Sequence, residues 1–294
     1  MSIISRTVCY MFKHSDDKRD AGLTTPADIV RFDDISYGPD PKWNVLDVYR
    51  PKDASGPLPV IVSIHGGGWV YGDKERYQYY CMSLAQHGFA VVNFTYRLAP
   101  QFKFPSSLQD TNRVFAWVLD NAAPYGFDSR NIFAVGDSAG AHMLGLYSCL
   151  CTNPAYARTL PFSVPEGFRP KAVALNCGVY RMEKSKKTDL TSLLMADLLP
   201  GKGLEEELRA ISVLEHVTPE FPPAFVMTAE GDFLADQALP FTEKLQALGV
   251  PAEYHYYGGP DNVLGHVFHC NIRLADAQQC NREECEFFRR WLEE

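Results

Sequence analysis

Short apolar runs alternate with amphipathic stretches along most of this chain. Uniformly apolar runs rich in β-branched and aromatic residues indicate buried strands, whereas apolar positions spaced three and four apart indicate helices. The predicted strands cover residues 30–37, 45–49, 59–64, 89–96, 131–136, 171–179, 222–232 and 252–257. The predicted helices cover residues 3–12, 74–87, 107–123, 141–150, 190–199, 204–213, 234–248 and 271–292.

This alternation predicts an α/β fold in which a mostly parallel central sheet is flanked by helices, and we expect residues 1–294 to form a single domain. Residues 180–220 break the alternation, because they place two short helices between consecutive strands. We expect this stretch, together with residues 1–25, to form a small helical cap over the strand ends, where open α/β sheets bind ligands. A peripheral decoration is the alternative. The charged run at 16–20 predicts a solvated turn.

The strand at 131–136 runs into Gly-Asp-Ser-Ala-Gly at 136–140, and a helical pattern follows at once. Strand, tight turn and helix with a serine at the apex is typical of the nucleophile elbow of α/β-hydrolases. The sequence therefore predicts Ser138 as a nucleophile, held in a strained turn at the amino end of a helix. A chance match in a loop is the alternative, and the elements on either side argue against it.

A nucleophilic serine needs a base within hydrogen-bonding reach, and the base needs an orienting carboxylate. In this fold, both follow the serine along the chain. Asp232 comes at the end of a strand and is the predicted acid, and His266 lies in the middle of the last loop and is the predicted base. His269 also qualifies by position, but it borders the closing helix and is predicted to cap or pack that helix. The weaker acidic candidates are Glu230, Asp236 and Asp261.

A glycine run follows the strand at 59–64, in the sequence His-Gly-Gly-Gly-Trp at 65–69. Glycines let the backbone approach a developing oxyanion closely, and such a loop at a strand end supplies N–H donors to it. We predict the N–H groups of Gly67, Gly68 and Ala139 as the oxyanion hole. The bulky neighbours Trp69, Tyr71 and Phe233 are predicted to bind substrate and to leave room only for short acyl groups.

Composition narrows the remaining function classes. The net charge is −8 and no basic stripe appears, so nucleic acid is not an expected partner. No stretch reads as a membrane span or a signal peptide, and none of the eight cysteines forms a C-x-x-C motif, so we expect a cytoplasmic protein with reduced thiols. The pair His266 and His269 has no evident third ligand, so we predict no metal.

These motifs together resemble the esterase and lipase family related to hormone-sensitive lipase. The resemblance rests on HGGGW at 65–69, YRLAP at 96–100, GDSAG at 136–140, Asp-Phe-Leu at 232–234 and His-Val-Phe at 266–268, and spans about residues 40–290. The family often has Asp-Pro-Leu and His-Gly-Phe at the last two positions, and neither departure removes a catalytic group.

The resemblance implies an α/β-hydrolase that cleaves small-molecule carboxylic esters through an acyl-enzyme on Ser138, without a cofactor. Residues 139–142 are also similar to arylformamidases, which share the fold, so amide hydrolysis is the alternative within enzymes. A ligand-binding protein on this fold is the alternative outside them, and the full candidate set of Ser138, Asp232 and His266 argues against it. We leave a homodimer open.

Overall fold

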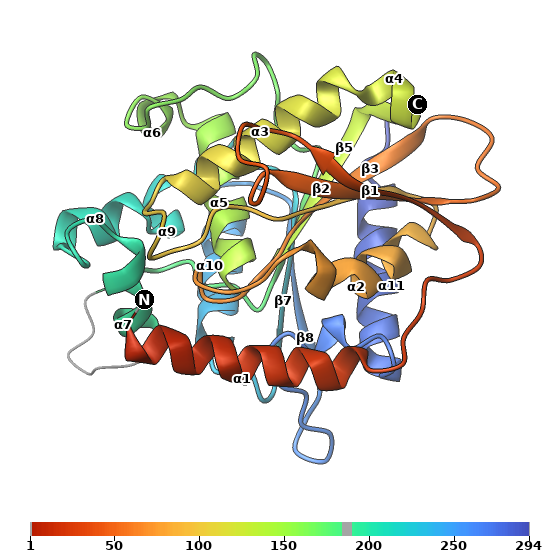
Figure 1. The fold of residues 1–294 in the computed structure, drawn as a ribbon. Coiled ribbons are helices and arrows are strands. Elements are labelled where there is room, and N and C mark those ends of the chain that lie inside the picture. Colours follow the sequence, from red (N-terminus) through yellow and green to blue (C-terminus); the bar gives the residue numbers. More distant parts are fainter. Residues whose placement is uncertain (1, 184–189, 294) are drawn as a thin grey trace.

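A computed structural model describes residues 2–183 and 190–293 of the chain (Figure 1). Its strands are β1 (Ile29–Ser36), β2 (Val45–Pro51), β3 (Leu58–Ile64), β4 (Ala90–Phe94), β5 (Phe127–Asp137), β6 (Val173–Asn176), β7 (Ala224–Ala229) and β8 (Ala252–Tyr257). Its first six helices are α1 (Ile3–Asp20), α2 (Lys74–Ala85), α3 (Ser106–Asp120), α4 (Ala122–Tyr125), α5 (Ala139–Thr152) and α6 (Pro154–Ala157). The others are α7 (Leu190–Leu198), α8 (Glu205–Ala210), α9 (Val213–His216), α10 (Ala235–Ala247) and α11 (Ala275–Arg289), with a 3-10 turn η1 (Phe268–Cys270).

The strands form one sheet in the order β1-β2-β4-β3-β5-β6-β7-β8. β2 pairs antiparallel with β1 and with β4, and every pairing from β4 to β8 is parallel. The central strands are buried along their whole length and mostly apolar because both of their faces are covered, which is the usual state of a parallel sheet. The α/β fold that the sequence predicted, with a mostly parallel sheet between helices, is therefore confirmed.

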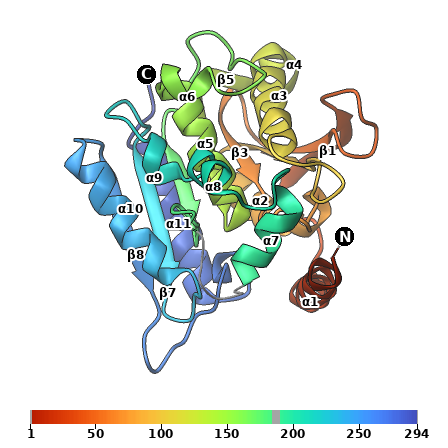
Figure 2. The same ribbon diagram turned by 90° about the vertical axis from the view of Figure 1, so that its left-hand side faces the viewer.

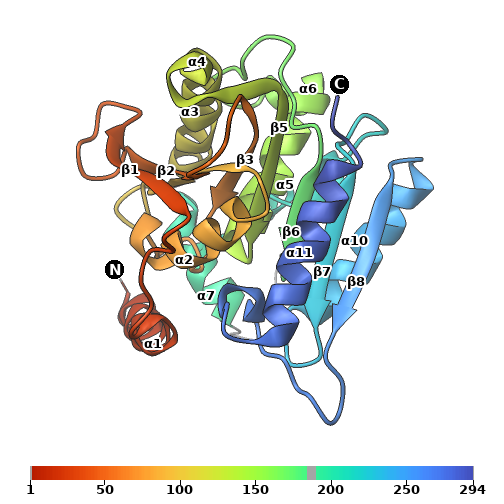
Figure 3. The same ribbon diagram turned by 90° about the vertical axis from the view of Figure 1, so that its right-hand side faces the viewer.

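Helices cover both faces of the sheet, and each layer has its own core (Figures 2 and 3). α2 and α11 pack on one face, where Phe133 of β5 stacks on Phe288 of α11 with ring centroids 5.0 Å apart. α3, α5 and α10 pack on the other face, where Phe115 of α3 stacks on Tyr147 of α5 at 4.6 Å. This packing fixes β5, whose carboxyl end carries the predicted nucleophile.

The prediction of a solvated turn at 16–20 is wrong, because α1 continues through this charged run to Asp20. Charged pairs along the helix support the extension: Lys13 binds Asp17 at 2.6 Å, and Arg19 binds Asp16 at 3.0 Å. Oppositely charged side chains one turn apart favour the helix, so a dense run of charges did not mean a break in it. β6 is also shorter than the predicted 171–179, and α11 begins four residues after the predicted start.

α1 lies across the carboxyl end of the sheet, with its amino end beside α7 (Figures 1 and 2). The hydroxyl of Ser2, its N-cap residue, donates to Asp197 of α7 at 2.9 Å, and Ser5 also donates to that carboxylate. The structure thus brings together the two segments from which we expect a cap, although residues 184–189 of the 180–220 stretch lie outside the described residues. Among the described helices, none combines the length and the apolarity needed to cross a bilayer.

Candidate active site

Ser138 occupies the junction between β5 and α5 with φ 52° and ψ −117°, a backbone conformation that residues other than glycine rarely adopt. The turn is so tight that a Cβ at Gly140 would lie 2.0 Å from the carbonyl oxygen of Ile64 on the neighbouring strand. The Ser138 N–H donates to the carbonyl of Asn176 at the end of β6, at 2.9 Å. Backbone strain of this kind is often found at functional sites, and this strained turn has the geometry of a nucleophile elbow.

Asp232 and His266 come from the ends of β7 and β8, and the structure brings them together. The His266 Nδ1 and Asp232 Oδ1 atoms are 2.6 Å apart, and Asp232 also accepts from the Thr228 hydroxyl at 2.7 Å and the Leu234 N–H at 2.9 Å. Burial alone would raise the pKa of Asp232, but its bond to His266, the charge of that imidazole and the other two donors outweigh burial and lower the pKa. The carboxylate is therefore ionised and fixed in orientation.

His269, the alternative base, is placed differently. Its side chain is fully buried, and burial lowers its pKa to about 3, with a further contribution from the charge of His266. Its Nε2 lies 3.6 Å from the Cys270 thiol, and its buried Nδ1 has no hydrogen-bond partner among the described residues. An imidazole that stays neutral over the whole working pH range cannot accept and return a proton, so the arrangement favours His266 as the base.

The glycine run forms a tight turn between β3 and α2. Gly67 has φ 116°, and a Cβ there would lie 2.1 Å from the Tyr71 carbonyl oxygen, so no larger residue fits this backbone. A Cβ at the adjacent Gly68 would lie 2.8 Å from Cδ1 of Leu194 on α7. Leu194 therefore packs against the predicted oxyanion loop, a position that no local pattern in the sequence indicated.

The loop is tied to the nucleophile strand through Asp137. The Gly66 N–H donates to Asp137 Oδ1 at 3.1 Å, and the Tyr77 hydroxyl donates to Oδ2 at 2.7 Å. Complete burial raises the pKa of Asp137 to about 6, against the lowering effect of these donors and of the His266 charge. Asp137 fills the variable position of the G-x-S-x-G motif, so the motif gave no reason to single it out.

Three side chains were predicted to bind substrate, and the structure places them in different surroundings. Trp69 is only 4% exposed, and its indole N–H lies 3.2 Å from Nδ1 of His142 in the core. Tyr71 is half-buried and donates its hydroxyl to Asp16 of α1 at 2.8 Å. Phe233 is 58% exposed, and its ring lies against His266 with centroids 4.3 Å apart. Trp69 thus does not stand as an exposed wall, because its positive φ and its bond to His142 direct the ring inward.

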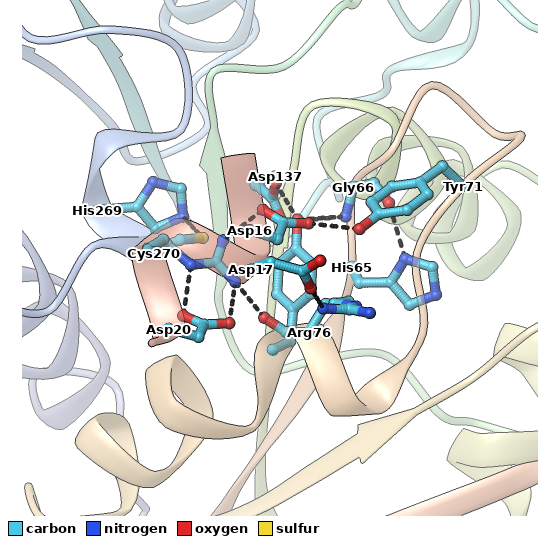
Figure 4. Close-up of polar contacts among 12 residues, drawn as sticks. Asp16, Asp17, Asp20, His65, Gly66, Tyr71, Arg76, Asp137, His269 and Cys270 are labelled. Carbon is cyan, nitrogen blue, oxygen red and sulfur yellow. Dashed lines mark hydrogen bonds and ion pairs between the residues drawn. The ribbon is translucent and has the colours of Figure 1, made fainter. Parts of the chain in front are cut away.

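The carboxyl half of α1 joins this region through a cluster of charges (Figure 4). Asp16 accepts from Tyr71, Asp17 pairs with Arg76 of α2, and Arg19 pairs with Asp20 at 2.7 Å. On the solvent side, α1 therefore fixes the segment that follows the predicted oxyanion loop.

Cys177 lies directly after β6 with φ 48°, buried beneath the acid and the base. Its Sγ lies within 4.8 Å of ligand atoms of Asp232 and His266, and its hydrogen-bonding contact is with Sδ of Met227 at 3.9 Å. Burial, together with the nearby Asp232 charge, raises the pKa of this thiol, so it stays protonated. The end of β6 thus binds the Ser138 backbone through Asn176 and places Cys177 close to Asp232 and His266.

Among the residues that the structure describes, two groups of side chains that could bind a metal come together, where the sequence suggested no third ligand. They are Asp137, His269 and Cys270, and Cys177, Asp232 and His266, each with ligand atoms within 4.8 Å of one another. In both groups the carboxylate oxygens already accept hydrogen bonds from protein donors, and the thiols are protonated by burial. We therefore assign no metal to either group. All eight cysteines are free.

A family model described as BD-FAE matches residues 46–245 of the chain. The carboxylesterase NlhH of Mycobacterium tuberculosis is 28% identical over 274 residues, which cover 88% of this chain and 84% of that protein. The versiconal hemiacetal acetate esterase of Dothistroma septosporum is 28% identical over 239 residues, covering 72% and 68%. The M. tuberculosis esterase LipC is 30% identical over 73% of this chain, but the match spans only 55% of its own length.

Solved structures with the same fold cover the chain almost completely. Esterase B of Lactobacillus rhamnosis, inhibited by a tributyrin phosphonate, superposes with a TM-score of 0.87 at 25% identity, over 98% of this chain and 94% of that one. A thermostable carboxylesterase from a metagenomic library superposes with a TM-score of 0.79 at 25% identity, with both chains fully covered.

Proposed function

The chain belongs to the BD-FAE family, within the esterases related to hormone-sensitive lipase, and is a carboxylic ester hydrolase; from this premise we propose that it cleaves short-acyl esters through an acyl-enzyme on Ser138. The observation that carries the proposal is the 2.6 Å bond between Asp232 and His266. Both residues lie close to Cys177, which follows Asn176, the residue whose carbonyl accepts from the Ser138 N–H. This arrangement supplies a nucleophile, a base and an orienting acid in the order that the chemistry needs.

In the proposed mechanism, the Ser138 hydroxyl attacks the acyl carbon while its proton passes to Nε2 of His266. Asp232 accepts the Nδ1–H bond and stabilises the imidazolium that forms. The N–H groups of Gly67, Gly68 and Ala139 bind the oxyanion, each donor lowering the barrier by on the order of 3 kcal/mol. His266 then gives the proton to the leaving alcohol, and water releases the acid from the acyl-serine by the same steps in reverse.

Leu194 supports the preference for short acyl groups. Its side chain is 3% exposed and contacts the space above Gly68, so it closes the region next to the oxyanion hole. We assign to Leu194 the closure that we first expected from Trp69, whose ring is turned into the core. Esters of acetic to butyric acid should therefore be good substrates, and acyl chains beyond about eight carbons should be poor ones because overpacking costs roughly 1–3 kcal/mol.

We further propose that α1 and the described parts of 180–220 act as the cap of this site. The contact of Ser2 and Ser5 with Asp197 supports the assignment, because it joins the two segments over the sheet end. A cytoplasmic location and a homodimer stay predictions. Light scattering on the purified protein tests the second, and a monomer mass at micromolar concentration would contradict it.

The test of the mechanism is covalent labelling. A butyryl phosphonate should add its mass to one serine in the native protein, and peptide mapping should locate it at Ser138. Ser138→Ala should take up no label and lose p-nitrophenyl acetate hydrolysis by about 10⁴-fold or more. N-formylkynurenine, assayed in parallel, should be the poorer substrate. Labelling elsewhere, or full turnover by the variant, would overturn the assignment.

A further inference from the structure

A large apolar side chain stands in solvent beside the proposed base. Phe233 is 58% exposed, yet its ring contacts the His266 imidazole, with centroids 4.3 Å apart and planes inclined by 43°. Single exposed apolar residues are common on protein surfaces and need no explanation. This one differs because, within the described part of the chain, its ring contact is with His266, the proposed proton carrier.

The backbone around Phe233 is fixed by hydrogen bonds. The Asp232 N–H donates to the Ala229 carbonyl at 3.0 Å, and the Leu234 N–H donates to the Asp232 carboxylate at 2.9 Å. The ring is therefore presented from a rigid support rather than from a loose loop. A rigid aromatic group binds a partner at little cost in conformational entropy, because it has few rotatable bonds to freeze.

A second exposed apolar residue, Val263, lies against the segment that carries Phe233. Val263 is 64% exposed, and a Cβ at Gly231 would lie 2.8 Å from its Cγ1 atom. The segments that carry Phe233 and Val263 are joined, since the Gly231 N–H donates to the Leu264 carbonyl at 2.8 Å. We call these two exposed side chains the Phe233–Val263 rim.

The chemistry of the site decides which half of an ester meets this rim. His266 returns its proton to the oxygen of the leaving alcohol, so the group attached to that oxygen starts next to the imidazole and to the ring that lies against it. The acyl half extends instead from the carbon held at the oxyanion loop, where Leu194 closes the space. The alcohol side is thus open and apolar, whereas the acyl side is closed.

We propose, on the basis of the ester hydrolysis inferred above, that the Phe233–Val263 rim binds an apolar ring in the alcohol part of the substrate. Preferred substrates are then short-acyl esters of arylmethyl or similar ring-bearing alcohols, rather than esters of small alkyl or polyhydroxy alcohols. Neither rim side chain carries a polar atom, so a hydroxyl-rich alcohol would lose hydration there and gain no hydrogen bond. A flat ring gains both apolar burial and an aromatic contact.

The test compares acetate esters that share the acyl group and a primary alcohol: ethyl, cyclohexylmethyl and benzyl acetate. The native enzyme should show kcat/KM about tenfold or more higher for the benzyl than for the ethyl ester. Phe233→Ala should reduce kcat/KM for the benzyl ester by about tenfold and for the ethyl ester by less than about threefold. Leu239→Ala is the matched control, because it also removes an exposed apolar side chain, on α10. This substitution should change neither value.

Binding provides a readout that does not depend on the chemical step. Benzyl alcohol should inhibit ethyl acetate hydrolysis competitively in the native enzyme and about tenfold more weakly in Phe233→Ala. Equal losses for both esters in that variant would overturn the proposal, because Phe233 would then act only through His266. The absence of any benzyl preference in the native enzyme would also overturn it. Failure to hydrolyse any of the three esters would instead refute the esterase function itself.

Discussion

Leu194→Ala is the substitution that tests the proposed acyl pocket most directly. The change removes the three outermost carbons of a side chain that lies 2.8 Å from the position of a Cβ on Gly68. The space released should accept about three more methylenes of an acyl chain. Each buried methylene contributes about 0.8 kcal/mol, or roughly fourfold in kcat/KM. The optimum should therefore move from butyrate towards hexanoate and heptanoate, with a gain of up to about 60-fold for chains that the native pocket excludes.

The same deletion also costs stability, by roughly 2–5 kcal/mol for a buried leucine. Met195→Ala is a matched control, because Met195 is the next residue of α7, is equally buried at 3% exposure, and has its Cβ 3.9 Å from the position of a Cβ on Gly203. The assay is kcat/KM for p-nitrophenyl esters from acetate to decanoate, with urea unfolding of each variant. A folded Leu194→Ala protein with the native chain-length profile would refute the reasoning, as would an equal shift in Met195→Ala.

Three further predictions follow from the contacts at the site. Asp232→Asn should lower kcat by about 10³- to 10⁴-fold with KM little changed and the unfolding midpoint retained, because the amide cannot hold the same imidazole tautomer; near-native kcat would contradict its role. Cys177→Ala should lower kcat a few-fold because it leaves a void beside Asp232 and His266, and Cys177→Ser should recover part of the loss by filling most of that void; a serine variant no better than alanine would argue against this supporting role. Burial lowers the pKa of His269 to about 3, so the stability that its neutral form provides is present above the unfolded pKa and is lost on acidification. Between pH 7 and pH 5 the free energy of unfolding should fall by about 2 kcal/mol for this reason. His269→Gln should remove this fall, as measured by urea unfolding, whereas the control His14→Gln on the exposed face of α1 should leave it in place.

Local patterns were sufficient to predict most of the fold. The strand around 131–136 and the glycine run at 65–69 are both recognisable within a few residues, because a buried strand and a tight turn each impose their own residue types. The charged run at 16–20 misled the prediction because its effect depends on helical spacing: Lys13 and Asp17 support each other only once the helix has formed. The predicted strand at 171–179 exceeds β6 because regular pairing covers only Val173–Asn176, although the N–H groups of Lys171 and Cys177 still donate to neighbouring strands.

The catalytic candidates were likewise predictable where a motif or a strand end marks them, as it does for Ser138 and Asp232. The supporting residues were not, because their roles depend on contacts between distant parts of the chain. Leu194 lies against Gly68 although more than a hundred residues separate them, and Cys177 lies close to Asp232 and His266. An apolar residue in a short helix, or a cysteine after a strand, looks the same in sequence whether it supports a site or only fills a core.

These supporting contacts would preorganise the proposed oxyanion loop. From the inside, the Gly66 N–H is held by Asp137, the residue just before the nucleophile, and by the Tyr77 hydroxyl at 3.0 Å. On the solvent side, α1 binds the residues that come directly after the glycine run. The Cys9 thiol donates to the Val70 carbonyl at 3.4 Å, and Asp16 accepts from the Tyr71 hydroxyl (Figure 4). Donors that are fixed before the reaction need no reorganisation when the oxyanion forms, which is the condition for strong electrostatic catalysis. The amino-terminal helix is therefore part of what keeps the loop in its working geometry, in addition to covering the end of the sheet.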